Sequence, residues 1–174
     1  MTSAFPGPIR QAGYVVRDID AAIAGWCRVG VGPWFTLRDL TQTLRYRGEL
    51  VEVVLHLAMA NSGSLQIELI QQVNDAPSAY REFLDSGGEG FHHYSFWPDD
   101  VAAARKTVEA AGWELIQESS SGVSTPFAYY AADGMTSTVH EISQLSEGVV
   151  GLDRMLTEAA AAWDGVTDPV RSLR

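Results

Sequence analysis

The 174-residue sequence has one cysteine, few basic residues and no long apolar run, and each shortage excludes a class of function. Cys27 has no second cysteine with which to form an intramolecular disulfide, and no Gly-x-Ser-x-Gly nucleophile motif is present. Twelve Lys and Arg residues against twenty-two Asp and Glu give a net charge of -10, which repels nucleic-acid phosphates. No stretch reaches the roughly 18 apolar residues that a membrane helix requires.

The remaining composition is that of a globular protein. Hydrophobic residues make up 46% of the chain, and its length predicts one domain or two small halves. Residues 1–8 lack the basic and apolar segments of a secretory signal. We therefore expect a soluble, cytoplasmic protein that has neither a nucleic-acid nor a membrane partner and acts on a small molecule.

Two segments of the sequence resemble each other and predict a duplicated fold. Residues 11–22 and 93–104 each contain a short β-like run, then an aspartate, then an alanine-rich stretch. The aspartates, Asp18 and Asp100, are placed to cap helices over 19–28 and 101–111. Further β-like runs follow each helix, at 34–37, 50–58 and 65–71 in the first half and at 113–116, 125–131 and 137–143 in the second.

These patterns predict an α+β fold in which two tandem βαβββ modules form a curved, mostly antiparallel sheet cleft. We expect one domain over residues 1–145, with modules over about 9–72 and 91–145 and a linker over 73–90 that includes a helix at 78–84. Residues 146–174 are expected to form a C-terminal helix and a tail that is loose from Gly165. Apolar residues at helical spacing predict that this helix docks on the domain or on a partner subunit.

Alternation along the predicted strands places four polar side chains on corresponding faces. Gln11 and Glu68 lie in the first and last strands of the first half, and His93 and Glu141 lie in the first and last strands of the second. A curved sheet would bring the four together at the seam between the halves. Two glutamates, a histidine and a glutamine suit a hard or borderline divalent cation. The alternative is that each is a separately hydrogen-bonded residue at the rim of the sheet.

The duplicated layout and these residues resemble the vicinal oxygen chelate superfamily, which includes glyoxalase I, methylmalonyl-CoA epimerase, extradiol dioxygenases and bleomycin-resistance proteins. The resemblance covers about residues 9–145, and within the superfamily the chain is similar to methylmalonyl-CoA epimerase. The stretches that carry this similarity are Val51–Val54, Ile67–Asp75, Gly90–Tyr94 and Val139–Gln144.

The resemblance implies a metal-dependent enzyme, either an epimerase or isomerase or a lyase. The favoured function is an epimerase or isomerase that acts through an enolate on a small carbonyl or acyl-thioester substrate. The resemblance also implies a divalent ion (Co, Mn, Ni, Zn or Mg) held by Gln11, Glu68, His93 and Glu141. Glu52 is implied as the proton-abstracting base, and Glu141 is implied either to return a proton from the other face of the substrate or to assist. The family normally has histidine where this chain has Gln11, and an amide oxygen is a weaker donor to first-row transition metals than imidazole. A homodimer and a hydrophobic or CoA-linked substrate are also implied.

Two alternatives stay open at this point. One is a metal-free binding or resistance protein of the same fold, which the glutamine at position 11 favours. The other is a ring-cleaving dioxygenase, which needs two histidines and a carboxylate around iron(II) and therefore needs His56 to join His93.

For a CoA-linked substrate, the basic residues that could bind the phosphates are Arg45, Arg47 and Lys106. Six aromatic residues are candidates for a cavity wall: Trp34, Phe35, Tyr46, Trp97, Phe127 and Tyr129.

Overall fold

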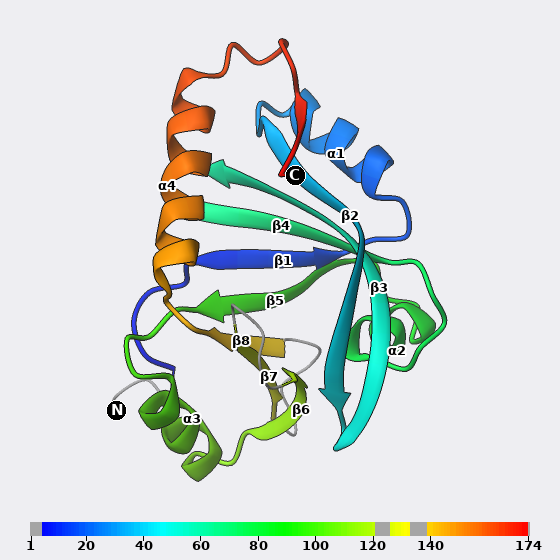
Figure 1. The fold of residues 1–174 in the computed structure, drawn as a ribbon, viewed down its shortest axis with the longest axis vertical. Coiled ribbons are helices and arrows are strands. Elements are labelled where there is room, and N and C mark those ends of the chain that lie inside the picture. The colour runs from blue at the N-terminus through cyan, green and yellow to red at the C-terminus, as the bar shows by residue number, and fades with distance from the viewer. Residues whose placement is uncertain (1–4, 121–125, 133–138, 174) are drawn as a thin grey trace.

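The computed structural model describes residues 5–120, 126–132 and 139–173. Its elements, labelled in Figure 1, are β1 (Gln11–Val15), α1 (Ile19–Arg28), β2 (Trp34–Tyr46), β3 (Glu49–Ser62), β4 (Leu65–Gln72), α2 (Ala79–Asp85), β5 (Gly90–Phe96), α3 (Val101–Ala110), β6 (Glu114–Ser119), β7 (Phe127–Ala131), β8 (Val139–Ser143), α4 (Glu147–Ala162) and β9 (Val170–Ser172). The helices predicted at 19–28, 78–84 and 101–111 agree with α1, α2 and α3. Residue 125 and residues 137–138 of the predicted strands lie outside the described residues. That the two halves are copies of one module remains a prediction.

The four helices begin at polar residues that satisfy free backbone groups. Asp18 and Asp100 accept hydrogen bonds from backbone N–H groups in the first turns of α1 and α3, as the sequence predicts. Ser78 and Ser146 do the same for α2 and α4. These caps fix where each helix starts and therefore where the strand before it ends.

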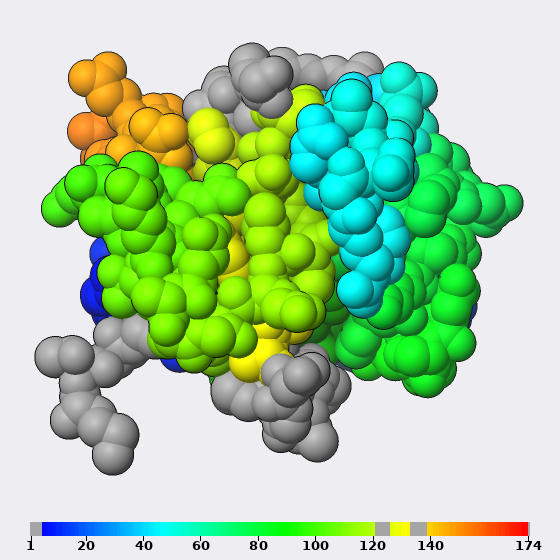
Figure 2. Space-filling view, turned by 90° about the horizontal axis from the view of Figure 1, so that it is seen from below, coloured from blue at the N-terminus to red at the C-terminus, as the bar shows by residue number. Residues whose placement is uncertain are grey.

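Eight of the strands form a closed ring. Their order is β3-β4-β1-β5-β8-β7-β6-β2, and β2 pairs again with β3. Within the ring, β1 runs parallel to β4 and β5 runs parallel to β8, whereas the other neighbours are antiparallel. The predicted α+β class is therefore confirmed. The cleft expected from the sequence is instead a barrel, because Leu44–Tyr46 of β2 pairs with Gln117–Ser119 of β6. Figure 2 shows this junction, with the tip of the β2–β3 hairpin (cyan) against β6 (yellow-green).

The second strand is much longer than the four residues predicted at 34–37. It pairs with β3 as far as Tyr46, and its register shifts at Arg38 and Asp39, where Asp39 has a φ of 52°. Polar residues after Leu37 conceal the strand in the sequence, because Asp39, Thr41, Thr43 and Arg45 form its exposed outer face.

Helices α1 and α3 cover the outer face of the ring, and α4 crosses one end of it. Ile19 and Ile23 of α1 pack on β3 and β4, and Val108 of α3 packs on Ile142 of β8. Figure 1 shows α4 crossing the ends of β3, β4, β1 and β5, where Leu156 is buried. No helix in the described part of the chain is long and apolar enough to span a membrane.

The C-terminal tail is paired, which corrects the expectation that it is loose. The last strand, β9, lies parallel to the start of β2, and the Trp34 N–H donates to the Pro169 carbonyl at 2.8 Å. The local sequence does not predict this three-residue strand, because the strand forms by pairing with β2 and not through the propensity of its own residues.

Candidate functional site

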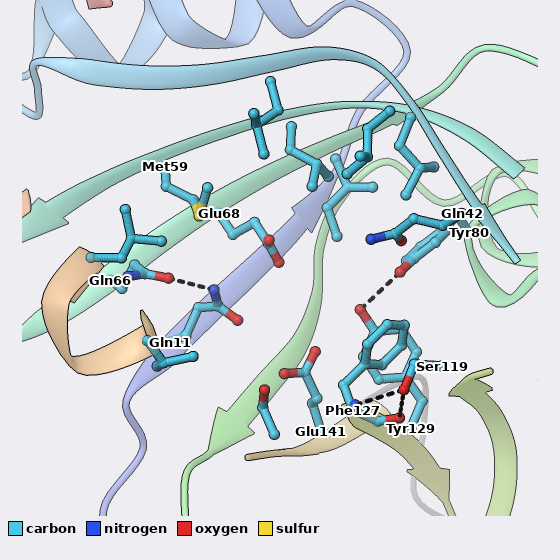
Figure 3. A pocket seen from close by; sticks show the side chains of 18 of the residues that line it. Gln11, Gln42, Met59, Gln66, Glu68, Tyr80, Ser119, Phe127, Tyr129 and Glu141 are labelled. Atoms are coloured by element: carbon cyan, nitrogen blue, oxygen red, sulfur yellow. Dashed lines mark hydrogen bonds between the residues drawn. The ribbon is translucent and has the colours of Figure 1, made fainter. Parts of the chain in front are cut away.

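The barrel encloses a cavity of about 350 Å³ that has an apolar wall and a polar wall. The apolar wall consists of Leu37, Leu40, Leu44, Leu55, Leu57, Met59, Ile70, Phe127, Val149 and Leu152. The other lining residues have polar atoms, and they are Gln11, Gln42, Gln66, Glu68, Tyr80, Trp97, Ser119, Tyr129, Glu141 and Ser143. Figure 3 shows Glu68 and Glu141 approaching the cavity from opposite walls, with Gln11 on one side and the Tyr80–Tyr129 pair on the other. A partly apolar cavity with a few convergent polar groups is the usual form of a small-molecule site.

The pairing of β1 with β5 positions His93 next to this cavity, although His93 is not among the residues that line it. Gly13 stands opposite His93 in the register, and a Cβ atom on Gly13 would lie 1.9 Å from the imidazole ring. Only glycine therefore allows the ring to occupy this place. His93 is fully buried, and its Nε2 has no hydrogen-bond partner.

The Nε2 atom of His93 faces both glutamates. It lies 3.5 Å from Oε2 of Glu141 and 3.9 Å from Oε2 of Glu68. Burial lowers the pKa of His93 well below its ordinary value. The imidazole is therefore neutral, and its contacts with the two glutamates are not ion pairs. An unpartnered ring nitrogen among two carboxylates is the environment in which a cation would satisfy all three groups.

Burial raises the pKa of both glutamates, by different amounts. The pKa of Glu68 rises to about 8, with the nearby Glu141 as a second cause. The pKa of Glu141 rises to about 7, opposed by hydrogen bonds from neighbouring hydroxyls. Ser95 donates to Oε1 of Glu141 at 2.7 Å and accepts from the Trp97 indole at 3.0 Å. Two carboxyl groups with different raised pKa values are a typical arrangement for acid–base chemistry.

Gln11 lies beside the carboxylates and is fixed by a second glutamine. Its Nε2 donates to Oε1 of Gln66 at 2.6 Å, and both side chains are buried. Figure 3 shows the Gln11 amide oxygen turned towards the space between Glu68 and Glu141. The structure thus places Gln11, Glu68 and Glu141 on the lining of one cavity, and His93 next to the two glutamates. That the four form one ligand set remains a prediction.

The donor set suits a divalent cation chemically, although its separations are wide. Nitrogen and oxygen ligands at about 2.1 Å from one ion stand roughly 3.0–3.4 Å apart. The 3.5 and 3.9 Å contacts of His93 are wider than this. Accordingly, no group of three or more His, Cys, Asp or Glu among the described residues is arranged as a metal site. The unpartnered His93 Nε2 and the two buried carboxyl groups nevertheless suit a divalent cation. One cation would give the nitrogen a partner and the two carboxylates a counter-charge.

His92 supports His93 from the other face of β5. Its Nδ1 lies 3.1 Å from the Nδ1 of His93, so one ring donates and the other accepts. Burial lowers the pKa of His92 to about 4, and its ring also bonds to the backbone of Ala79 in α2. His92 is therefore a structural neighbour of the site, as the alternation of β5 predicts.

Glu52 does not reach the cavity, and the prediction that it does is wrong. It is exposed, whereas the residues of β3 that line the cavity are Leu55, Leu57 and Met59. Side chains alternate along a strand, so an even-numbered residue of this stretch points outward. His56 lies on the same outer face, where its Nδ1 accepts a hydrogen bond from the backbone of Asp39 at 3.1 Å.

The aromatic wall is only partly as expected. Trp97, Phe127 and Tyr129 line the cavity, whereas the other three candidates, Trp34, Phe35 and Tyr46, do not. Tyr80 of α2 was not predicted, and its hydroxyl lies 3.2 Å from that of Tyr129. Burial raises the pKa of both phenols, which therefore remain hydrogen-bond donors at neutral pH. The signal that could have identified Tyr80 is its place as the second residue of α2, among the apolar residues that are buried with Ala79.

Comparison with known proteins decides the family. Residues 10–129 match the family described as the Glyoxalase/Bleomycin resistance protein/Dioxygenase superfamily. The chain belongs to this superfamily. The match includes Gln11, Glu68 and His93 and ends before Glu141. Comparison of this chain with curated proteins found no match.

Solved structures show that the superfamily fold is present. Methylmalonyl-CoA epimerase from Mycobacterium tuberculosis has a TM-score of 0.57 at 16% identity, covering 87% of this chain and 95% of that one. The epimerase of Streptomyces coelicolor, in complex with 2-nitronate-propionyl-CoA, has a TM-score of 0.54 at 17% identity and covers 80% and 95%. A hypothetical protein from Bacillus halodurans has a TM-score of 0.56 at 16% identity, again covering 80% and 95%. At this identity the likeness establishes the fold alone.

Proposed function

We propose that the protein is an epimerase or isomerase that transfers a proton through an enolate on a small carbonyl or acyl-thioester substrate. The observation that carries this proposal is the pair Glu68 and Glu141, whose carboxyl groups approach one cavity from opposite walls. Without a bound cation, burial raises their pKa values to about 8 and about 7. Acids and bases of proton-transfer enzymes work best when their pKa values lie near the working pH. The family and the fold of the epimerases support the same reaction class.

We further propose that a divalent cation, from the set Co, Mn, Ni, Zn and Mg, is held by Gln11, Glu68, His93 and Glu141. When bound, such an ion supplies positive charge that stabilises a developing enolate oxygen. The support is chemical: the His93 nitrogen lacks a partner and the two buried carboxyls lack a counter-charge. Gln11 contributes an amide oxygen where the family has imidazole, so the affinity for transition metals is expected to be modest.

In this proposal Glu141 takes the α-proton of the substrate. Its carboxyl is oriented by Ser95, which is itself held by Trp97, so the base is fixed before a ligand arrives. Glu68 comes from the opposite wall, and a cation bound to it would keep it ionised, so that it could accept a proton there. It is therefore placed to return or exchange a proton on the other face. The apolar wall excludes water that would otherwise quench the carbanion.

The test is exchange of the substrate's α-proton with deuterated water, followed by NMR on 2-oxo and 3-oxo compounds and 2-substituted acyl thioesters. Glu141→Gln should slow exchange at least about 100-fold, because a general base contributes roughly 10²–10⁴-fold. Glu52→Gln is the matched control, since the same substitution then falls on an exposed side chain. Unchanged exchange in Glu141→Gln would remove Glu141 from the mechanism, and loss of exchange in Glu52→Gln would restore Glu52.

One observation favours the alternative of a metal-free binding protein. Gln11 is tied to Gln66 at 2.6 Å, which holds its amide by a partner other than a cation. Elemental analysis after reconstitution with each of the five metals separates the two functions. Stoichiometric metal together with α-proton exchange supports the enzyme, whereas neither metal nor exchange supports the binding protein. A ring-cleaving dioxygenase is not proposed, because His56 lies outside the cavity.

The homodimer and the cytoplasmic location remain predictions from the resemblance and the composition. Sedimentation equilibrium of the purified chain would test the first. Fractionation of the cells that produce it would test the second.

A further inference from the structure

Building on the function proposed above, we propose that the substrate is an uncharged, mainly apolar carbonyl compound whose oxygen is bound by the Tyr80–Tyr129 hydroxyl pair. Compounds that place a carboxylate in the cavity, or that depend on binding of their phosphates, are excluded. This separates the chain from epimerases whose solved complexes contain a CoA derivative.

The charge of the cavity is the first support. Among the described residues no Lys or Arg lines it, and its acidic side chains are Glu68 and Glu141. A ligand carboxylate would therefore meet two carboxyl groups and a wall of leucines, and an uncompensated buried charge is strongly disfavoured. A bound divalent cation would be neutralised by the same two glutamates, so an additional anion would still lack a counter-charge.

The arginines outside the cavity give independent support, because most of them already have acidic partners. The pairs are Arg10–Asp153, Arg17–Glu89, Arg38–Asp20, Arg47–Glu82, Arg81–Asp75 and Arg105–Glu118. Of the residues considered for CoA phosphates, Arg47 binds Glu82 at 2.8 Å and Arg45 donates to the Gly48 carbonyl at 2.7 Å. Lys106 lies on α3, on the outer face of the barrel. The field of the whole chain, with a net charge of -10, also disfavours an anionic ligand.

The size and the apolar wall define the body of the ligand. About 350 Å³ is at the lower end of ligand cavities, so it suits a molecule of one or two rings or a short chain. The leucines of β2 and β3 form one continuous side of this space. An apolar body would bind there by burial and would need no polar partner.

The tyrosine pair defines where the ligand oxygen lies. The two hydroxyls are 3.2 Å apart, and both side chains are buried. Each phenol has one hydrogen, and their mutual hydrogen bond uses only one of the two. Without a ligand, the second hydrogen can bond to Glu141, to which Tyr129 is already hydrogen-bonded. A ligand oxygen would take the place of the Glu141 carboxylate as the acceptor. Figure 3 shows the pair opposite Gln11, so an oxygen bound there lies beside both glutamates.

Three compounds with one skeleton test this preference. Calorimetric titration of the full chain would compare 2-tetralone, the hydrocarbon tetralin and tetralin-2-carboxylic acid. We expect the ketone to bind about 10-fold or more tightly than either of the others, because a buried hydrogen bond and an uncompensated charge each change affinity by that order. Acetyl-CoA in excess should not displace the ketone. Equal affinity of ketone and hydrocarbon, tighter binding of the acid, displacement by acetyl-CoA or no binding of the ketone would overturn the inference.

Matched variants identify the hydroxyls. The double variant Tyr80→Phe/Tyr129→Phe should lose the preference for ketone over hydrocarbon and keep the affinity for tetralin. Tyr130→Phe is the control, because Tyr130 follows Tyr129 on β7, is equally buried and binds Glu109 and Arg105 outside the cavity. A preference that survives the double variant would overturn the role of the pair. If the preference holds but 2-tetralone shows no α-proton exchange, the binding inference stands and the proposed function fails for this compound class.

Discussion

At the scale of single residues, Gly13 is the residue on which the place of His93 depends. Gly13→Ala would put a methyl group 1.9 Å from the imidazole, so the ring must move away from the two glutamates. We expect a loss of about 1–3 kcal/mol in the free energy of unfolding, which is the usual cost of overpacking, and weaker metal binding. Urea denaturation and metal titration measure the two effects.

A second glycine provides the control. Gly25 lies in α1, where a Cβ atom would meet only Arg28, at 3.7 Å. Gly25→Ala should therefore raise stability by about 0.5–1 kcal/mol, since alanine favours a helix. Equal effects of the two substitutions would show that His93 does not depend on the space left by Gly13.

Gln11 offers a test of the metal proposal that does not need a substrate. Gln11→His replaces an amide oxygen by imidazole, so we expect the affinity for Co²⁺ or Zn²⁺ to rise by an order of magnitude. Gln66→Leu, which removes the partner of Gln11 without adding a ligand, should leave the affinity within a few-fold of the parent. If neither the parent nor Gln11→His takes up metal in an equilibrium titration, the cation site is refuted.

The grouping of Gln11, Glu68, His93 and Glu141 could be predicted because strand alternation decides which side chains share a face. The same rule argues against Glu52, because the inward side of this strand is the one that carries Val53 and Leu55. The prediction that Glu52 is the base came from the family resemblance. Tyr80 was missed for a different reason. It lies in a segment that is polar in sequence, and only the packing of α2 against the barrel places its hydroxyl beside Tyr129.

At the scale of elements, α4 closes the cavity and is fastened by one buried side chain and a few polar contacts. Leu156 packs on Phe35 and Met59, and Asp153 accepts a hydrogen bond from Arg10 at 3.0 Å. Leu156→Ala should lower stability by about 2–5 kcal/mol, as for other buried leucines. Val150→Ala, at an exposed position of the same helix, should change it by less than about 0.5 kcal/mol. Thermal denaturation compares them, and equal effects would show that α4 is not anchored through Leu156.

Helix starts could be predicted from sequence, whereas the limits of some strands could not. The caps of α1 and α3 are local signals, since Asp18 and Asp100 bind backbone groups only three residues away. The length of β2 and the existence of β9 depend instead on partners far away in the chain. Closure of the barrel through Leu44 and Ser119 is likewise a tertiary event with no local signature.

At the scale of the whole molecule, stability without metal should fall as the pH rises from 6.5 to 8. The folded-state pKa values of Glu68 and Glu141, about 8 and about 7, exceed the ordinary 4.5. Their contribution to stability is therefore full below the unfolded-state pKa and is lost as the pH passes 7 and 8. Burial lowers the pKa values of His92, to about 4, and of His93, so these two groups act in the opposite sense. Their effect fades as the pH rises past the ordinary 6.5 and offsets part of the loss.

The expected loss over this interval is about 1–2 kcal/mol, from the two titrations together. Urea midpoints at pH 6.5 and pH 8 measure it. The double variant Glu68→Gln/Glu141→Gln should flatten the dependence, and a bound divalent cation at pH 8 should restore stability by mass action. A midpoint that rises with pH in the parent would contradict the buried, protonated state of these acids.

The short pairing of β9 with β2 bears on how copies of the protein behave towards one another. In a chain shortened after Asp164, the backbone groups of Trp34 and Thr36 that now bond to Pro169 and Leu173 would be left bare. Bare strand edges recruit the edges of other molecules and lead to aggregation. We therefore expect the shortened chain to self-associate more readily than the full chain, although residues 165–173 are absent from the lining of the cavity.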